Sequence, residues 1–297
     1  MSTQSNEYPH FLGSEIEQSA MTNAAFSVLP VPYEKTVSYG GGTAAGPRAI
    51  LEASWQLETW DGKSDPSKHG IHTCQAIDCQ GIDADVIVAI AQATESIVRA
   101  RSMPVVLGGE HTVTWGVIEG LLNAGVSDFG VVQIDAHADL RDTYEGNPLS
   151  HACVMKRVVD AGVPLFQLGV RALCEEEVAT RKQFNVRYKD AEEIVPKQFG
   201  NIELPNDFPA QVFFTLDIDG MDPSVFPSTG TPVPGGLTWY QTLNLFESVA
   251  SQRKIIGFDI MEFSPIAGMN AYDFAAAMLT YKLMGIVQRT RPGAQGG

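Results

Sequence analysis

Three short segments of the sequence carry carboxylate and imidazole side chains at spacings that suit metal binding. They are residues 108–111 (GGEH), residues 135–139 (DAHAD) and residues 217–219 (DID). Side chains two residues apart in an extended chain point the same way, so DAHAD would present three donors together. The six donors are His111, Asp135, His137, Asp139, Asp217 and Asp219.

Carboxylates gathered in this way need cations, because desolvated like charges repel one another. Six donors exceed the four that a tetrahedral zinc takes, whereas they suit two ions about 3.5 to 4 Å apart that share carboxylates. Oxygen and imidazole donors without a thiolate favour Mn²⁺. Divalent cations lower the pKa of bound water, so the predicted reaction is hydrolysis.

Each segment by itself has a simpler explanation. DAHAD could form a hydrogen-bonded turn, the two aspartates of residues 217–219 could cap a loop, and His111 could bind backbone at the start of a helix. The metal interpretation gains weight because all three segments follow candidate strands. Ligands bind at the carboxyl ends of strands in open α/β sheets.

Strands and helices that would position these segments alternate along the chain. Apolar and β-branched runs predict strands at residues 26–31, 105–107, 129–134, 165–170, 212–216 and 255–258. Helices are predicted near residues 85–101, 112–124, 152–161, 175–184, 238–251 and 272–287. Strands that are apolar throughout are covered on both faces. This predicts an α/β fold with three α/β/α layers around a mainly parallel sheet.

Length and composition predict one large domain over residues 1–297, with residues 1–25 as an N-terminal extension. The net charge of −15 repels phosphate backbones and anionic lipids, so nucleic acid and membranes are not expected partners. We see no leader and no apolar run long enough to span a membrane. The four cysteines form no CxxC pair. We therefore expect a cytoplasmic protein.

Two loops rich in glycine and proline need a separate interpretation. Residues 38–48 (SYGGGTAAGPR) lack the GK[ST] of a phosphate loop and are predicted to lead into a helix whose first turn holds Pro47. Residues 223–236 (PSVFPSTGTPVPGG) directly follow a predicted strand. We expect the second stretch to be a rigid loop that shapes a cleft, not a linker.

Five motifs together resemble those of the ureohydrolase family of arginases and agmatinases. They are GGEH, DAHAD, SHACV at 150–154, TLDIDGMDPSVFPSTGTPVPGG at 215–236 and DIMEFSP at 259–265. The resemblance covers most of the chain, from about residue 31 to residue 287. It implies an arginase-like fold with about eight parallel strands and a pair of Mn²⁺ ions at the carboxyl edge of the sheet.

The resemblance also implies roles for single residues. One ion would be held by His111, Asp135, Asp139 and Asp217, and the other by Asp135, His137, Asp217 and Asp219. Glu262 would bind the substrate guanidinium, which suits a bidentate carboxylate. Asp139 would pass a proton to the leaving amine, and His151 would bind near the substrate and shuttle protons. Without the resemblance, Glu262 could be a surface residue and His151 a loop imidazole.

The loop of residues 140–154 (LRDTYEGNPLSHACV) bears on the substrate. It lacks the Ser-Gly-Asn pattern of arginases and resembles the agmatinase branch. Asp142 and Glu145 suit a dication such as agmatine, although acidity can serve solubility alone. We therefore expect hydrolysis of agmatine to urea and putrescine by a homo-oligomer, which the family makes a trimer or a hexamer.

Several alternatives stay open at this point. The substrate could be aminopropylagmatine, guanidinobutyrate, arginine or another guanidino compound. A deacetylase-like amidohydrolase would need fewer metal ligands, so the full donor set and Glu262 argue against it. A catalytically inactive regulatory paralogue would have no need of all six donors.

Overall fold

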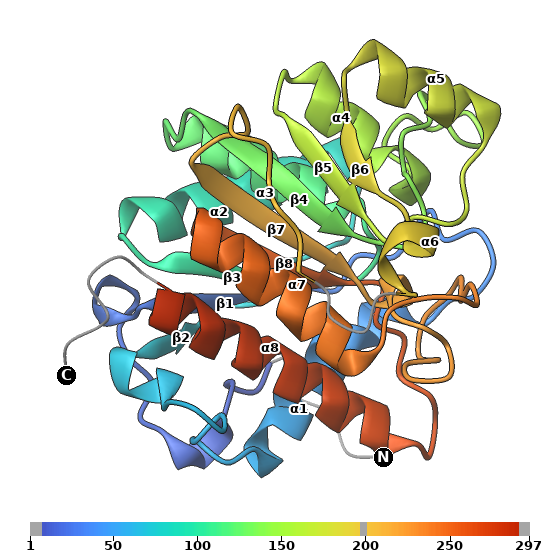
Figure 1. Ribbon diagram of the computed structural model, residues 1–297. Coiled ribbons are helices and arrows are strands. Elements are labelled where there is room, and N and C mark those ends of the chain that lie inside the picture. Colours follow the sequence, from blue (N-terminus) through green and yellow to red (C-terminus); the bar gives the residue numbers. More distant parts are fainter. Residues whose placement is uncertain (1–7, 197–200, 291–297) are drawn as a thin grey trace.

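The strands of the computed structural model form one sheet of eight, in which every neighbouring pair runs parallel (Figure 1). The structure describes residues 8–196 and 201–290. The order across the sheet is β2 (Ile71–Thr73), β1 (Phe26–Val31), β3 (Met103–Gly108), β8 (Lys254–Met261), β7 (Gln211–Asp217), β4 (Phe129–Ile134), β5 (Leu165–Leu168) and β6 (Arg187–Lys189). The predicted parallel sheet is confirmed.

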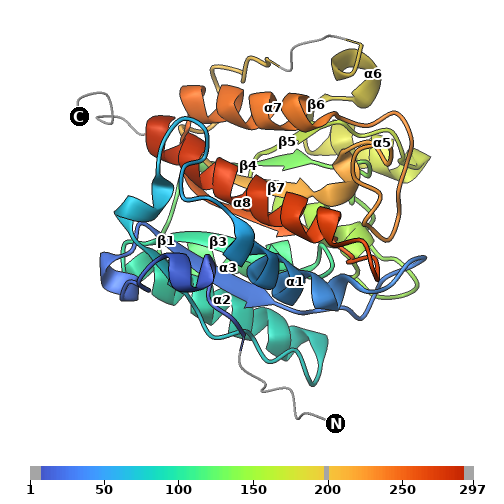
Figure 2. The same cartoon turned by 90° about the horizontal axis from the view of Figure 1, so that it is seen from below.

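Helices cover both faces of the sheet (Figures 1 and 2). One face packs against α1 (Gly46–Ala53), α7 (Trp239–Gln252) and α8 (Asn270–Thr290). The other packs against α2 (Asp83–Arg99), α3 (Val113–Asn123) and α4 (Val154–Asp160), while α5 (Glu175–Gln183) and α6 (Ala191–Ile194) lie near β5 and β6. This confirms the three layers. None of the helices in residues 8–196 and 201–290 has the length and apolar character that a membrane crossing needs.

Alternating side chains let the strands supply both layers of the core. Phe214 and Leu216 of β7 pack with α7 and α8, whereas Phe213, the residue before Phe214, faces the layer of α2 and α3. Residues 212–217 of this strand are all buried because both of its faces are covered.

The strands β2 and β6 were not predicted. Each has three residues, and their sequences (IHT and RYK) are too short and too polar to show an apolar run. They become strands by pairing with β1 and β5 at the two edges of the sheet. The predicted strand at 165–170 ends early, at Leu168, because Gly169 takes a positive φ of 87°.

Two residues of the predicted N-terminal extension belong to the hydrophobic core. Phe11 and Leu12 are fully buried. Their amides donate hydrogen bonds to Oγ1 of Thr73 (2.9 Å) and Oγ of Ser54 (2.8 Å). The first seven residues of that extension lie outside the described residues, and the domain boundaries stay a prediction.

Candidate metal centre

The carboxyl ends of β3, β8, β7 and β4 lie next to one another at the centre of the sheet. β3 leads to His111, β4 leads to Asp135, β7 ends at Asp217 and β8 leads to Glu262. Because parallel strands present their carboxyl ends on one edge, residues that are far apart in the sequence meet here.

His111 is buried at the centre of a first group of donors. Its Nδ1 lies 3.1 Å from Oδ2 of Asp135, 3.1 Å from Oδ2 of Asp139 and 3.2 Å from Oδ2 of Asp217. Burial alone would lower the pKa of His111, but these carboxylates outweigh it and raise the pKa well above its usual value.

His137 belongs to a second group. Its Nδ1 lies 3.1 Å from Oδ2 of Asp219 and 3.5 Å from Oδ1 of Asp135. Burial opposes the charged form, but the two carboxylates raise the pKa of His137 to about 12. Asp135 faces His111 with one oxygen and His137 with the other, so it joins the two groups.

The carboxylates of the cluster crowd one another. Burial and the charges of Asp219 and Asp135 raise the pKa of Asp217 well above its usual value. Burial and Asp135 likewise raise the pKa of Asp139 to about 6. A raised pKa means that the charged form is disfavoured, so the cluster gains free energy from a bound cation.

The arrangement of these donors fits divalent cations. Ligand atoms of His111, Asp135 and Asp217 lie within 4.8 Å of one another, and so do those of Asp135, His137 and Asp219. Adjacent ligands of an octahedral cation with bonds of about 2.2 Å are about 3.1 Å apart, which matches the spacings around His111. The buried Nδ1 of His111 also makes no well-directed hydrogen bond with any described residue, as expected of a nitrogen that faces a cation.

The DAHAD segment reaches this arrangement differently from the sequence argument. β4 ends at Ile134, and the amide of His137 donates to Oδ1 of Asp135 (2.6 Å) in a tight turn. Asp139 then takes a left-handed backbone conformation with φ 53°. The expected extended alternation is therefore wrong. The donors converge through a hydrogen-bonded turn. The turn that was the alternative to metal binding is therefore present, and it brings the donors into the cluster.

Polar neighbours that the sequence analysis missed hold the carboxylates in place. Gln133 donates from Nε2 to Oδ2 of Asp135 (2.7 Å), and Thr231 donates from Oγ1 to Oδ2 of Asp219 (3.1 Å). The sequence could have indicated Gln133, because it is a polar residue in an otherwise apolar strand, two positions before Asp135. No such signal marks Thr231, because it comes from a loop 12 residues after Asp219.

Glu262 and His151 lie together beside the cluster. Oε1 of Glu262 accepts the amide of His111 (2.7 Å) and lies 3.5 Å from Nδ1 of His151. Burial opposes the charged imidazole, but Glu262 raises the pKa of His151. Nε2 of His151 is buried and has no hydrogen-bond partner among the described residues. A carboxylate that can bind a cation thus lies next to a group that can carry a proton.

A cavity of about 220 Å³ opens over these groups. Among the predicted residues, it is lined by His137, Asp139, His151, Asp217, Asp219 and Glu262, whereas His111 and Asp135 do not line it. Five more residues line it: Ser38, Arg141, Tyr144, Ala152 and Thr231. Ser38 and Thr231 come from the two glycine- and proline-rich loops, so both loops shape this cleft.

Asp142 and Glu145, which suggested a dication, do not line the cavity. Asp142 pairs with Arg157 (3.2 Å) and Lys156 (3.5 Å). The residues of this loop that line the cavity with their side chains include Arg141, whose guanidinium lies over the ring of Tyr144, 5.3 Å from its centroid. These two acidic residues therefore do not support a dicationic substrate, contrary to the expectation from the sequence.

Hydrogen bonds from Arg171, which the sequence analysis did not single out, hold the loop of residues 223–236. The guanidinium of Arg171 donates to backbone carbonyls of the loop and of the segment after β7, including those of Val233 (2.8 Å) and Asp219 (2.6 Å). The loop is therefore tied to the end of β7, which supports its interpretation as a rigid wall.

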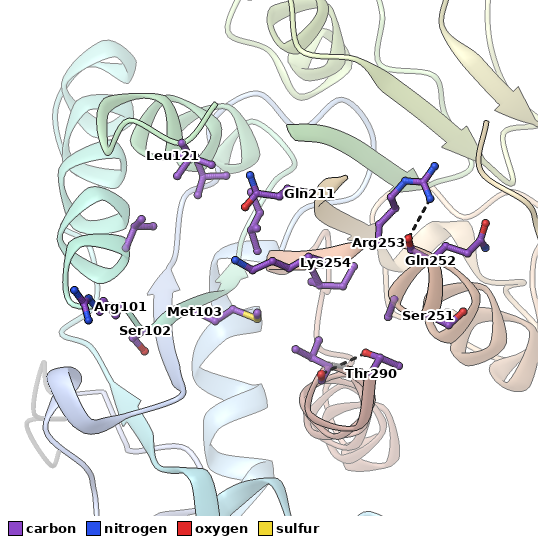
Figure 3. A pocket seen from close by; sticks show the side chains of 16 residues that line it. Arg101, Ser102, Met103, Leu121, Gln211, Ser251, Gln252, Arg253, Lys254 and Thr290 are labelled. Atoms are coloured by element: carbon purple, nitrogen blue, oxygen red, sulfur yellow. Dashed lines mark hydrogen bonds between the residues drawn. The ribbon is translucent and has the colours of Figure 1, made fainter. Parts of the chain in front are cut away.

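A second cavity, of about 740 Å³, lies at the opposite end of the strands (Figure 3). Met103, Gln211 and Lys254, which begin β3, β7 and β8, line it. Among the described residues that line this cavity there is no carboxylate, imidazole or thiol. This cavity therefore contains none of the donor side chains expected from the motifs.

Comparison with known proteins gives one consistent result. The model of the arginase family matches residues 24–285. A curated relative from Synechocystis sp., named N(1)-aminopropylagmatine ureohydrolase, is 39% identical over 91% of this chain and 92% of its own length. The agmatinase of Pyrococcus horikoshii is 31% identical over 93% of this chain and 96% of its own. The crystal structure of the agmatine ureohydrolase of Thermoplasma volcanium superposes with a TM-score of 0.82, at 27% identity, over 91% of this chain and 92% of that one.

Proposed function

Because this chain belongs to the arginase family and is a ureohydrolase of the agmatinase type, we propose that it hydrolyses agmatine to urea and putrescine with two Mn²⁺ ions. The observation that carries this proposal is the position of Glu262 and His151 beside six gathered metal donors. A guanidinium group bound there would lie next to both the cluster and a proton carrier.

Each group of donors would hold one ion. One ion would be held by His111, Asp135, Asp139 and Asp217. The other would be held by Asp135, His137 and Asp219, together with Asp217, which the family resemblance adds to this set. The oxygen and imidazole donors support Mn²⁺. When bound, the ions supply the positive charge that makes water nucleophilic at neutral pH.

Glu262 binds and orients the substrate. Its carboxylate pairs with the planar guanidinium, which offers parallel N–H donors. The amide of His111 fixes Oε1 of Glu262 in place, so the guanidinium carbon is held over the cluster at little further cost in entropy. Net positive charge on that carbon favours attack by water.

Asp139 and His151 transfer the protons that the reaction requires. The carboxylate of Asp139 takes up the proton of the attacking water and delivers it to the leaving amine. His151 lines the cavity, its Nε2 has no hydrogen-bond partner among the described residues, and it supplies a proton to the amine as urea and putrescine separate.

Two observations support guanidino substrates other than agmatine. The Synechocystis relative is named for aminopropylagmatine, which carries the same guanidinium on a longer cationic chain. Arg141 is the only Arg or Lys among the described residues that line the cavity, and it could pair with the carboxylate of guanidinobutyrate. The first observation makes aminopropylagmatine the second candidate.

A urea-release assay on Mn²⁺-loaded protein tests the proposal, with agmatine, aminopropylagmatine, guanidinobutyrate and arginine compared side by side. We expect the highest kcat/KM for agmatine and no turnover after metal removal. A higher value for aminopropylagmatine would move the substrate to the second candidate, and arginine as the best substrate would contradict the agmatinase assignment. The predicted trimer or hexamer is tested by light scattering on the same sample.

A further inference from the structure

Glu110 is a buried carboxylate that the proposed mechanism does not use. It precedes His111 in the sequence and is fully buried. Its Oε2 accepts the amides of Lys35 (2.6 Å) and Thr36 (2.7 Å), and its Oε1 accepts the hydroxyl of Thr36 (2.6 Å). A charge buried at this depth is retained only where such bonds satisfy it. Glu110 therefore binds residues 35–36 firmly to the end of β3.

Thr36 passes this anchoring on to His151. The same Oγ1 that donates to Glu110 accepts the amide of His151 at 2.9 Å, across 115 positions of sequence. Oγ1 of Thr112 makes a second contact with this segment: it lies 3.0 Å from Oε1 of Glu110 and 3.1 Å from the carbonyl oxygen of Leu149, and these two acceptors share its single proton. Both ends of the segment 149–151 thus connect to one carboxylate.

The amide of His151 needs a partner from outside its own segment. His151 begins a short 3₁₀ turn (His151–Cys153) that leads into α4. The first amides of a helical segment have no acceptor within it, and the residue before the segment usually provides one. Ser150 holds that position but makes no such hydrogen bond. Its Oγ has no partner among the described residues. Thr36 takes over the role of the cap.

We propose that Thr36 is a positioning residue of the active site: with Glu110 behind it, its hydroxyl holds His151 at the distance from Glu262 at which the imidazole can serve the reaction. This inference rests on the proposed function, because it assumes that His151 carries a proton. The imidazole has few other restraints. Its Nδ1 faces Glu262, the ring of Tyr144 lies edge-on with centroids 6.4 Å apart, and Nε2 has no partner among the described residues.

The substitution Thr36→Val tests the proposal because valine keeps the shape of threonine and removes its hydroxyl. We expect the amide of His151 to exchange with deuterium about tenfold faster, and kcat to fall about tenfold with KM within about twofold, as for the loss of one hydrogen bond. The acid limb of the pH profile of kcat should also move. A merely structural role would lower the melting temperature without moving that limb.

Two control variants accompany this test. Thr36→Ser keeps the hydroxyl, and it should restore both the protection of the amide and most of kcat. Thr94→Val removes another buried threonine hydroxyl, one that has no hydrogen-bond partner among the described residues. Thr94 lies in α2, away from the cavity lining, so we expect exchange at His151 and kcat to stay at the values of the unmodified protein.

A double-mutant cycle shows whether Thr36 acts through His151. In a His151→Asn background, Thr36→Val should cause little further loss of kcat. An equal loss in both backgrounds, or unchanged exchange at His151 in Thr36→Val, would overturn the proposal. If the unmodified protein releases urea from no guanidino compound, the proposed function fails instead. Hydrogen exchange still decides whether Thr36 anchors His151 in that case.

Discussion

Nε2 of His111 lies 2.9 Å from Oγ1 of Thr215, while Nδ1 of the same ring faces the carboxylates of the cluster. The register of β7 and β8 pairs Thr215 with Asp259, a fully buried carboxylate that also accepts the hydroxyl of Thr114 (2.8 Å). The side chain of Thr215 hydrogen-bonds Asp259, and because a carboxylate only accepts, the hydroxyl proton of Thr215 points to Asp259 and its oxygen accepts Nε2–H from His111. This arrangement selects the tautomer that leaves the lone pair of Nδ1 free for a cation.

The substitution Thr215→Val should therefore weaken Mn²⁺ binding about 10- to 100-fold, the usual effect of removing a partner of a metal ligand. Isothermal titration of the metal-free protein with MnCl₂ measures this directly, without any substrate. Thr215→Ser keeps the hydroxyl and should bind Mn²⁺ nearly as well as the unmodified protein. Equal affinities for the valine and serine variants would show that the hydroxyl does not orient His111.

Asp217→Asn should have opposite effects on metal binding and on the stability of the metal-free protein. Burial and the charges of Asp219 and Asp135 raise the pKa of Asp217 above the usual 3.8. A raised pKa means that the folded state loses stability as pH rises from about 4 through the raised value. Asparagine resembles the protonated form. The metal-free variant should thus melt at a higher temperature at pH 7.5, and this difference should shrink as the pH falls toward 4.

Metal analysis completes that test. After dialysis against Mn²⁺, Asp217→Asn should retain less than the two ions per chain expected of the unmodified protein, because Asp217 belongs to both proposed ligand sets. Full metal content in the variant, or a lower melting temperature without metal at pH 7.5, would contradict the assignment.

Glu262→Gln should lower kcat/KM at least about 30-fold, because it removes the charge that faces the guanidinium. The urea-release assay measures the change. Glu145→Gln is the matched control, since Glu145 is exposed and does not line the cavity. We expect its kcat/KM to stay within about twofold of the unmodified value. Similar losses in both variants would mean that Glu262 acts only through the overall charge.

Asp61→Asn tests a contact that is independent of the metal centre. Burial alone would raise the pKa of Asp61, but Arg289 and the amides of Ser64 and Lys63 outweigh it and lower the pKa. A lowered pKa contributes stability above about pH 4, and this contribution is lost as the pH falls through the folded-state pKa. The variant should thus lose about 1 to 3 kcal/mol of unfolding free energy at pH 7.

Urea denaturation at pH 7 and at about pH 3, below the usual pKa of 3.8, measures this loss, which should be smaller at the lower pH. Asp128→Asn serves as the control, because Asp128 is exposed and forms no ion pair among the described residues. Asparagine also tolerates its positive φ of 56°. A loss at about pH 3 as large as the loss at pH 7 would contradict the role of the charge of Asp61.

The sequence by itself determined the family, the layers and the identity of the candidate donors. Strands buried on both faces are continuous apolar runs, and a run such as residues 129–134 ending in DAHAD stands out locally. Donors placed directly after strands are expected to share one edge of a parallel sheet, whatever separates them along the chain. Short edge strands such as β6 leave no such signal, because their pairing partner and not their composition makes them strands.

Only the tertiary structure decided which neighbours hold those donors. Thr215 meets Asp259 through the register of two strands, and Thr36 reaches the amide of His151 across 115 residues. In the loop of residues 140–154, Asp142 pairs with Arg157, whereas its neighbour Arg141 lines the cavity. Local composition cannot encode such contacts. They depend on the relative positions of several elements, which exist only once both faces of the sheet are packed.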